Sequence, residues 1–154
     1  GYSRGEFVDS LVSVCQKYEQ PLTEEFSLHD RGNLLSRLEW IQHNKDADED
    51  TAYNALGCSS LVYRSHPFAL FMAQKHWDDP AAALDGMFNL VNYGGDCDTT
   101  GAMYGAVVGA RHGMIFPEEM VRQIVGVDRL IQLAEEMYDL RNNIGKELHP
   151  NTSS

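Results

Sequence analysis

The chain has 154 residues, of which 43% are hydrophobic and 23% charged. This composition is typical of one folded domain, expected here over residues 1–154, and it excludes a disordered, collagen-like or disulfide-scaffold protein. Twelve Lys and Arg against 23 Asp and Glu give a net charge of −11, and because such a surface repels phosphates and anionic lipids, we expect neither a nucleic acid nor a membrane as a partner.

Apolar residues recur at helical spacing along most of the chain, and strand-like alternation is scarce. Residues 7–18 predict a first helix, which Pro21 ends. Asp30 is expected to cap a second helix that ends before Asn44. The mostly acidic run 45–50 predicts a solvated loop or the start of a helix.

Two prolines indicate where the next helices begin. Residues 57–60 predict a loop, and Pro67 is expected in the first turn of the helix that follows it. Asp79 is expected to cap another helix, with Pro80 as its first residue. Both expectations depend on the missing N–H of proline, which costs nothing in a first turn.

The last third of the chain predicts two further helices. One begins at Pro117, and the other is expected over residues 128–144, with Gly145 as its stop. About eight helices and no convincing strand make the predicted fold class all-α, a multi-helix bundle.

The cysteines suggest a reducing compartment. Cys15, Cys58 and Cys97 are an odd number and form no CxxC pair. The longest apolar run without a charge, about residues 99–110, is shorter than a membrane span. We therefore expect reduced thiols and a cytoplasmic location.

Residues 94–101, with the sequence GGDCDTTG, are the segment that carries chemistry. They lead into a predicted helix with glycines at positions 101, 105 and 109, each of which costs roughly 1 kcal/mol of helix propensity relative to alanine. The spacing places these glycines on one face, where a neighbouring helix or a ligand can approach the backbone closely.

Asp96, Asp98 and Thr99 are the candidate metal ligands. A lone Asp98 could simply cap the helix, but two carboxylates one residue apart exceed what a cap requires. Their combined charge of −2 outweighs the roughly +0.5 charge of a helix N-terminus. Two carboxylates and a hydroxyl suit Mg²⁺, Mn²⁺ or Ca²⁺ better than zinc.

Other motifs share this spacing. An EF-hand loop that began at Asp96 would need a glutamate where Val107 stands, so it is excluded. A phosphate-binding glycine loop would need a lysine near Thr99, and none is present. A DxDxT phosphatase, with Asp96 as nucleophile and Asp98 as acid and base, stays an alternative, although it requires a buried strand before Asp96.

The segment 94–99, its continuation over 101–113 and the Pro-Glu-Glu of 117–119 resemble the C-terminal signature of the ADP-ribosylglycohydrolase family. The resemblance covers about residues 56–124. It implies an all-α orthogonal bundle like the C-terminal part of that fold. It also implies a binuclear Mg²⁺ or Mn²⁺ centre that hydrolyses the glycosidic bond between ADP-ribose and a modified acceptor, so that ADP-ribose or an ADP-ribosylated protein is the expected partner.

The resemblance carries over to particular residues. Asp96, Asp98 and Thr99 match metal ligands of the family, and Gly57, Cys58, Ser59 and Ser60 match the loop that lies along ADP-ribose. No catalytic residue is assigned.

This chain also departs from the family pattern. The family usually has glycines where Cys58, Ser59 and Ser60 stand, and often an acid in place of Arg64. It supplies its remaining metal ligands from an upstream Thr-Asp-Asp motif that this sequence lacks. The chain is therefore expected to be a C-terminal fragment or shortened homologue of such a hydrolase. Whether a second copy or another chain completes the site is left open by the sequence. The alternative is a remnant that binds ADP-ribose or a partner without catalysis.

Overall fold

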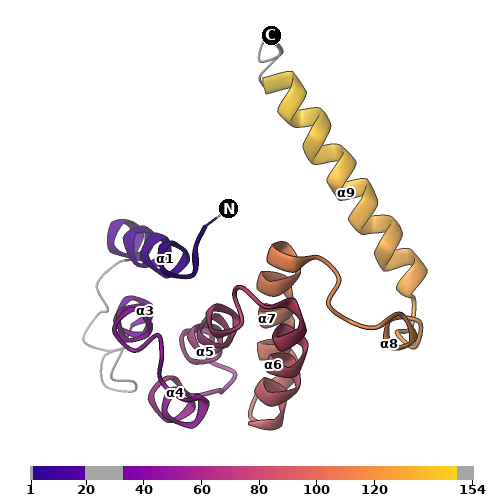
Figure 1. The fold of residues 1–154 in the computed structure, drawn as a ribbon. Coiled ribbons are helices and arrows are strands. Elements are labelled where there is room, and N and C mark those ends of the chain that lie inside the picture. The colour runs from indigo at the N-terminus through magenta and orange to yellow at the C-terminus, as the bar shows by residue number, and fades with distance from the viewer. Residues whose placement is uncertain (1, 20–32, 149–154) are drawn as a thin grey trace. The chain divides into compact units, whose positions relative to one another are not determined.

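Every regular element in the described part of the chain is a helix. The computed structural model describes residues 2–19 and 33–148, with side chains up to Ile144, and this part contains eight helices and no strand (Figure 1). The all-α prediction is confirmed. Residues 1–115 and residues 116–154 form two compact units, which are described separately.

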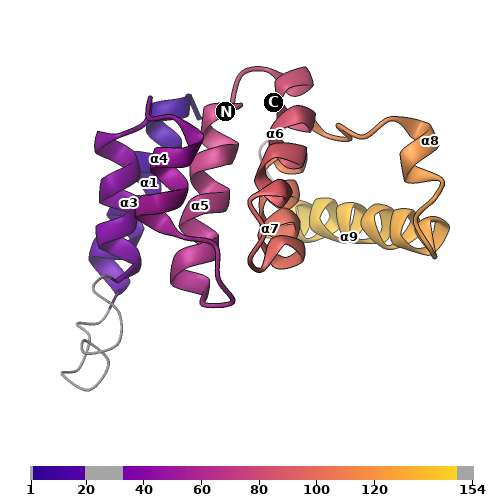
Figure 2. The same cartoon turned by 90° about the horizontal axis from the view of Figure 1, so that it is seen from below.

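Helix α5 is the centre of the first unit. Figure 2 shows it between α1, α3 and α4 on one side and α6 and α7 on the other, and it contacts all five. The six helices of this unit are α1 (Arg4–Tyr18), α3 (Leu34–His43), α4 (Glu49–Leu56), α5 (Val62–Lys75), α6 (Pro80–Asn92) and α7 (Cys97–His112).

The apolar sequence of α5 explains its central position. From Pro67 to Gln74 every side chain is buried, so the helix is covered on all sides. Gln74 is the polar member of this run, and both ends of its amide are satisfied. Its Oε1 accepts from Arg4 Nε at 2.9 Å, and its Nε2 donates to Lys45 O at 3.1 Å.

Helices α1 and α3 both begin with side-chain caps. Ser3 and Glu6 form a reciprocal capping box at the start of α1. The Glu19 carboxylate, just after α1, accepts the N–H groups of Leu34 and Leu35 at 2.9 Å each. The cap of α3 is Asn33, whose side chain accepts from Ser36 N.

The expected cap at Asp30 is therefore wrong. Asn33 lies directly before the first helical residue, where its Oδ1 reaches the Ser36 N–H at 2.8 Å. Asp30 itself and Pro21 lie outside the described residues. The predicted end of α3 before Asn44 is confirmed.

The acidic run 45–50 contains a helix start, as predicted. Asp48 caps α4, and its carboxylate accepts from the Thr51 N–H at 2.7 Å. This bond, together with one from the Thr51 hydroxyl, lowers the pKa of Asp48.

The two prolines of α5 and α6 differ in position. Asp79 caps α6 with Pro80 as its first residue, as predicted. The prediction for Pro67 is wrong, because α5 begins at Val62 and Pro67 lies inside it. The first turn of α5 is already closed by Arg64 N and Ser65 N on Leu61 O, so proline removes only one later backbone bond.

The second unit contains α8 (Glu118–Val121) and α9 (Val127–Leu148). Pro117 is the N-cap of α8, as its position predicts. Gly145 does not end the last helix, which continues to Leu148. One glycine costs only about 1 kcal/mol in a helix interior, which a long helix tolerates.

Helix α9 is amphipathic and displays large apolar side chains such as Leu130, Met137 and Tyr138. Its charged residues keep it from being a membrane span. None of the helices in the described residues combines the length and apolarity that crossing a bilayer requires.

Two partly buried histidines predict a pH-dependent stability. Burial lowers the pKa of His66 and of His76 below the ordinary value of 6.5, and Glu49, whose Oε1 lies 3.9 Å from His76 Nε2, opposes the effect only in part. The unfolded chain therefore binds more protons than the folded chain just below pH 6.5. We expect the free energy of unfolding to fall as the pH is lowered from 7.5 to 5.

Urea unfolding followed by tryptophan fluorescence checks this prediction, since Trp40 and Trp77 both lie in the first unit. The double variant His66→Gln, His76→Gln should show a flatter dependence on pH than the wild type. The control is His43→Gln, at an exposed position. An unchanged pH dependence in the double variant would contradict the expectation.

Candidate functional site

A turn built from two glycines connects α6 to α7. Gly94 has φ +74° and Gly95 has φ +67°. Residues with a Cβ adopt this left-handed backbone conformation only at a cost in free energy. Asp96 follows as the N-cap of α7, and its carbonyl accepts the Thr100 N–H at 3.0 Å. The sequence GGD therefore reverses the chain within three residues and starts a helix.

The position of Asp98 corrects one interpretation of the sequence. The cap of α7 is Asp96, without a side-chain cap bond, so Asp98 is not the helix cap. It lies in the first turn of α7, where its Oδ1 accepts from the Thr99 N–H at 2.9 Å. The phosphatase interpretation is wrong as well, because Asp96 follows a helix and a glycine turn, where that motif needs a buried strand.

Asp96, Asp98 and Thr99 lie together at the N-terminus of α7. The Thr99 N–H and then the Asp96 side chain lower the pKa of Asp98. Asp98 and Thr99 are exposed and Asp96 is half-buried. An ion can therefore approach these oxygen atoms from solvent.

The donor set fits a hard divalent cation in chemistry but supplies only part of a coordination sphere. All three side chains offer oxygen, as Mg²⁺ and Mn²⁺ require. Among the residues that the structure describes, no group of three or more His, Cys, Asp and Glu side chains could hold a metal ion. Two octahedral ions need about twelve positions, so other ligands would have to fill most of them.

The loop 57–60 packs directly against this turn. Gly57, with φ +79°, ends α4, and Cys58 follows with its carbonyl oxygen accepting the Asp96 N–H at 3.4 Å. The Cys58 side chain is buried, Ser59 is half-buried and Ser60 is exposed. The structure therefore brings the predicted metal-binding and ADP-ribose-binding segments side by side.

Tyr93, which directly precedes the turn, is bonded to Asp50 and stacked on Tyr53, both in α4. Its hydroxyl donates to Asp50 Oδ1 at 2.6 Å, and its ring stacks on Tyr53 with centroids 4.8 Å apart. Burial and this bond raise the pKa of Tyr93. The sequence alone gives no sign of the contact, because α4 and the end of α6 meet only in the folded chain.

The glycines of α7 have different surroundings. A Cβ on Gly101 would lie 3.2 Å from Val91 Cγ1, and one on Gly105 would lie 3.2 Å from Met87 Cε. These two glycines allow α6 and α7 to pack closely, as the sequence indicated. A Cβ on Gly109 would meet nothing within 4 Å.

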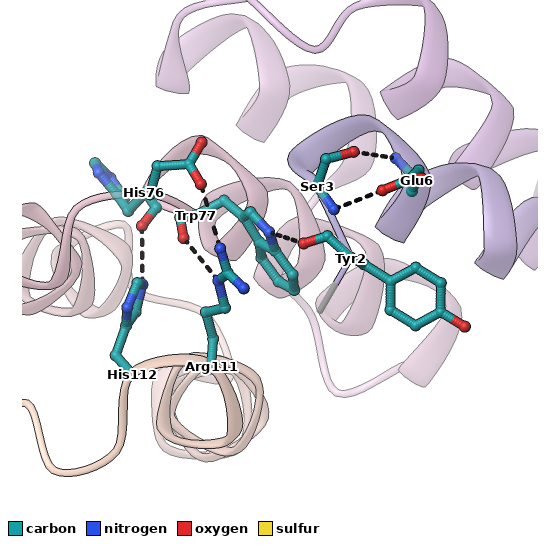
Figure 3. Close-up of polar contacts among 8 residues, drawn as sticks. Tyr2, Ser3, Glu6, His76, Trp77, Arg111 and His112 are labelled. Carbon is teal, nitrogen blue, oxygen red and sulfur yellow. Dashed lines mark hydrogen bonds and ion pairs between the residues drawn. The ribbon is translucent and has the colours of Figure 1, made fainter.

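A pocket lies at the other end of α7. Figure 3 shows the Trp77 indole N–H donating to Tyr2 O, at 3.0 Å, and Arg111 Nε donating to Trp77 O, at 3.3 Å. These contacts join the start of α1, the end of α5 and the end of α7. The adjoining pocket, of about 510 Å³, is lined mainly by Phe7, Trp77 and small apolar side chains of α7.

One family model matches almost the whole chain. The model of the ADP-ribosylglycohydrolase family matches residues 2–147. The chain belongs to the ADP-ribosylglycohydrolase family. The match includes the segment 56–124, on which the sequence resemblance depends, and extends it in both directions.

Three individual proteins are similar to this chain at low sequence identity. Protein YegU of Escherichia coli is 34% identical over 122 residues, which cover 74% of this chain and 34% of that protein. ADP-ribosylhydrolase ARH3 of Danio rerio is 26% identical over 153 residues, covering 88% of this chain and 40% of the relative. A protein of Archaeoglobus fulgidus is 30% identical over 147 residues, covering 94% and 42%.

This chain therefore spans between 34% and 42% of the length of these relatives. No solved structure matches it.

Proposed function

We propose that this chain forms the C-terminal, metal-binding part of a hydrolase that cleaves the glycosidic bond between ADP-ribose and a modified acceptor. The observation that carries the proposal is the cluster of Asp96, Asp98 and Thr99 at the start of α7, set beside the loop 57–60. Membership of the family and similarity to an ADP-ribosylhydrolase support it.

In this proposal, one group of residues binds the cation and another binds the substrate. Asp96, Asp98 and Thr99 would hold Mg²⁺ or Mn²⁺, two ions in a complete centre. Divalent cations in such a site supply Lewis-acid stabilisation of the charge that develops at the anomeric carbon, and they orient water. The loop 57–60 would bind ADP-ribose beside them through backbone groups and the hydroxyls of Ser59 and Ser60.

Charge gives the cations a second task. The chain carries −11 at neutral pH, and the diphosphate of ADP-ribose is also anionic. Asp96 and Asp98 would repel such a substrate unless bound cations neutralised them. We therefore propose that ADP-ribose binds more tightly when the cation is present.

The remaining ligands would come from elsewhere. Three oxygen donors leave room for water, for substrate hydroxyls and for carboxylates of another segment, of a second copy or of a complementing chain. An ADP-ribosylated protein is the proposed substrate. A cytoplasmic location is also proposed, since Cys15, Cys58 and Cys97 are free thiols.

The variant Asp98→Asn tests the proposed function in the intact protein. We expect it to abolish Mg²⁺-dependent release of ADP-ribose from an ADP-ribosylated peptide. It should also weaken Mn²⁺ binding, measured by calorimetry, about tenfold or more, because a neutral amide replaces a charged ligand. Asp139→Asn, which removes the same charge from an exposed position on α9, is the control. Undiminished release by Asp98→Asn would refute the assignment.

A non-catalytic module that binds ADP-ribose or a partner is the second candidate. It is favoured by the small number of metal donors among the described residues. Calorimetry separates the two functions. Retained ADP-ribose affinity without Mn²⁺ binding or hydrolysis would favour the binding module.

A further inference from the structure

The side chain of Cys58 contacts the residues on either side of the segment that carries the proposed metal ligands. It is 7% exposed, and its Sγ lies 3.3 Å from Gly94 O and 3.2 Å from Thr100 Oγ1. Gly94 opens the turn, and Thr100 lies one helical turn into α7. One buried thiol therefore joins the residues on either side of Asp96 and Asp98.

The donors and acceptors around Cys58 and Thr100 can be assigned. The Thr100 hydroxyl donates to Asp96 O at 2.7 Å, so its oxygen is free to accept. The single thiol proton of Cys58 can then go to Gly94 O or to Thr100 Oγ1. In both cases the thiol is the donor that links the loop 57–60 to the turn.

The backbone of Cys58 adds a second hold. Its carbonyl oxygen accepts the Asp96 N–H at 3.4 Å and occupies the space that a Cβ on Gly95 would fill, at 1.8 Å. The residue therefore fixes the turn by its side chain and its main chain together. Other roles for the thiol lack support, since it forms no disulfide and faces the core.

We infer that Cys58 is a positioning residue that fixes the Gly94–Asp96 turn and thereby sets the geometry of Asp96 and Asp98. The inference rests on the proposed metal-binding function. Cys58 is the residue of the loop 57–60 whose side chain is buried, so it can support the turn from inside the protein. Groups that orient metal ligands from behind typically change metal affinity by about 10- to 100-fold when they are lost.

Three substitutions separate hydrogen bonding from packing. Cys58→Ser keeps a donor, Cys58→Val fills the space of the thiol and slightly more without a donor, and Cys58→Ala loses both the donor and the volume. Thr100→Val removes the hydroxyl partner and is the second route if the Cys58 variants fold poorly. Cys15→Ser, at a half-buried cysteine of α1, is the matched control.

The first measurement is amide hydrogen exchange by NMR in the full chain, without metal. We expect exchange at residues 95–100 to accelerate about tenfold in Cys58→Val, Cys58→Ala and Thr100→Val, and to stay near the wild-type rate in Cys58→Ser. Amides of Val8 and Leu38, which lie in the core of α1 and α3, should not change. Unchanged exchange at 95–100, or equal acceleration throughout the unit, would overturn the inference.

The second measurement is the affinity for Mn²⁺ alone, by calorimetry. We expect it to fall about tenfold in Cys58→Val and to recover to within about threefold of wild type in Cys58→Ser. Equal affinities for wild type and Cys58→Val would overturn the inference even if exchange accelerates. Absence of Mn²⁺ binding in the wild type, with the exchange pattern as expected, would instead refute the proposed metal centre and support the hold on the turn.

Discussion

Gly95→Ala is expected to lower the free energy of unfolding of the first unit by about 3 kcal/mol. Gly95 has φ +67°, where alanine is less stable by roughly 1–2 kcal/mol. The new Cβ would also lie 1.8 Å from the backbone oxygen of Cys58, which cannot swing away as a flexible side chain does. Relief of such a clash costs typically about 1–3 kcal/mol.

The neighbouring glycine provides the control. Gly94 has φ +74°, but a Cβ there would meet nothing within 4 Å. Gly94→Ala should therefore lose only the conformational part, about 1–2 kcal/mol. Urea unfolding followed by tryptophan fluorescence measures both variants, and equal losses would show that contact with Cys58 O is not the cause. Mn²⁺ affinity should fall further in Gly95→Ala than in Gly94→Ala.

Gly86→Ala is expected to cost about 2 kcal/mol. Gly86 is buried in α6, and a Cβ there would lie 2.3 Å from His76 Cδ2 and 2.6 Å from the Tyr104 hydroxyl. Tyr104 is fully buried, and its hydroxyl donates to Ala83 O at 2.7 Å, so it has little freedom to move. The overpacking penalty of up to about 3 kcal/mol exceeds the gain in helix propensity of about 1 kcal/mol.

Gly109→Ala should change stability in the opposite direction. It is also a helical glycine, but with nothing within 4 Å of the added Cβ, so only the propensity gain of about 1 kcal/mol is expected. The comparison by urea unfolding has an unambiguous result. If both variants were more stable than the wild type, the close approach of the added Cβ at position 86 to His76 and Tyr104 would not be destabilising.

Local sequence patterns predicted the helices of this chain well. The errors concern helix ends whose positions depend on tertiary packing. The stripe of residues 7–18 and the pair Asp79 and Pro80 depend on neighbours in sequence, and the structure agrees with both. Pro67 was expected in a first turn, but burial of α5 on all sides favours a helix that begins earlier, at Val62. Gly145 shows the same limit, since propensity alone does not end a long helix.

For the candidate site, the proposed metal ligands could be predicted from the sequence, but the residues that hold them in place could not. Asp96, Asp98 and Thr99 are adjacent, so their type and spacing suffice to predict a cation site. The contacts of Cys58 with Gly94 and Thr100 span 36 and 42 residues, and no short motif encodes them. Tyr93 and Asp50, 43 residues apart, illustrate the same point. Such pairs arise only when α4, α5 and α6 pack.

The stack of Tyr93 on Tyr53 makes the turn optically visible. Two phenol rings with centroids 4.8 Å apart and planes 24° from parallel interact electronically, and one of them directly precedes Gly94. Near-ultraviolet circular dichroism of the unlabelled chain should therefore respond when the turn is rearranged. Titration with Mg²⁺, which is itself transparent, could then be followed through an internal chromophore, without any attached probe.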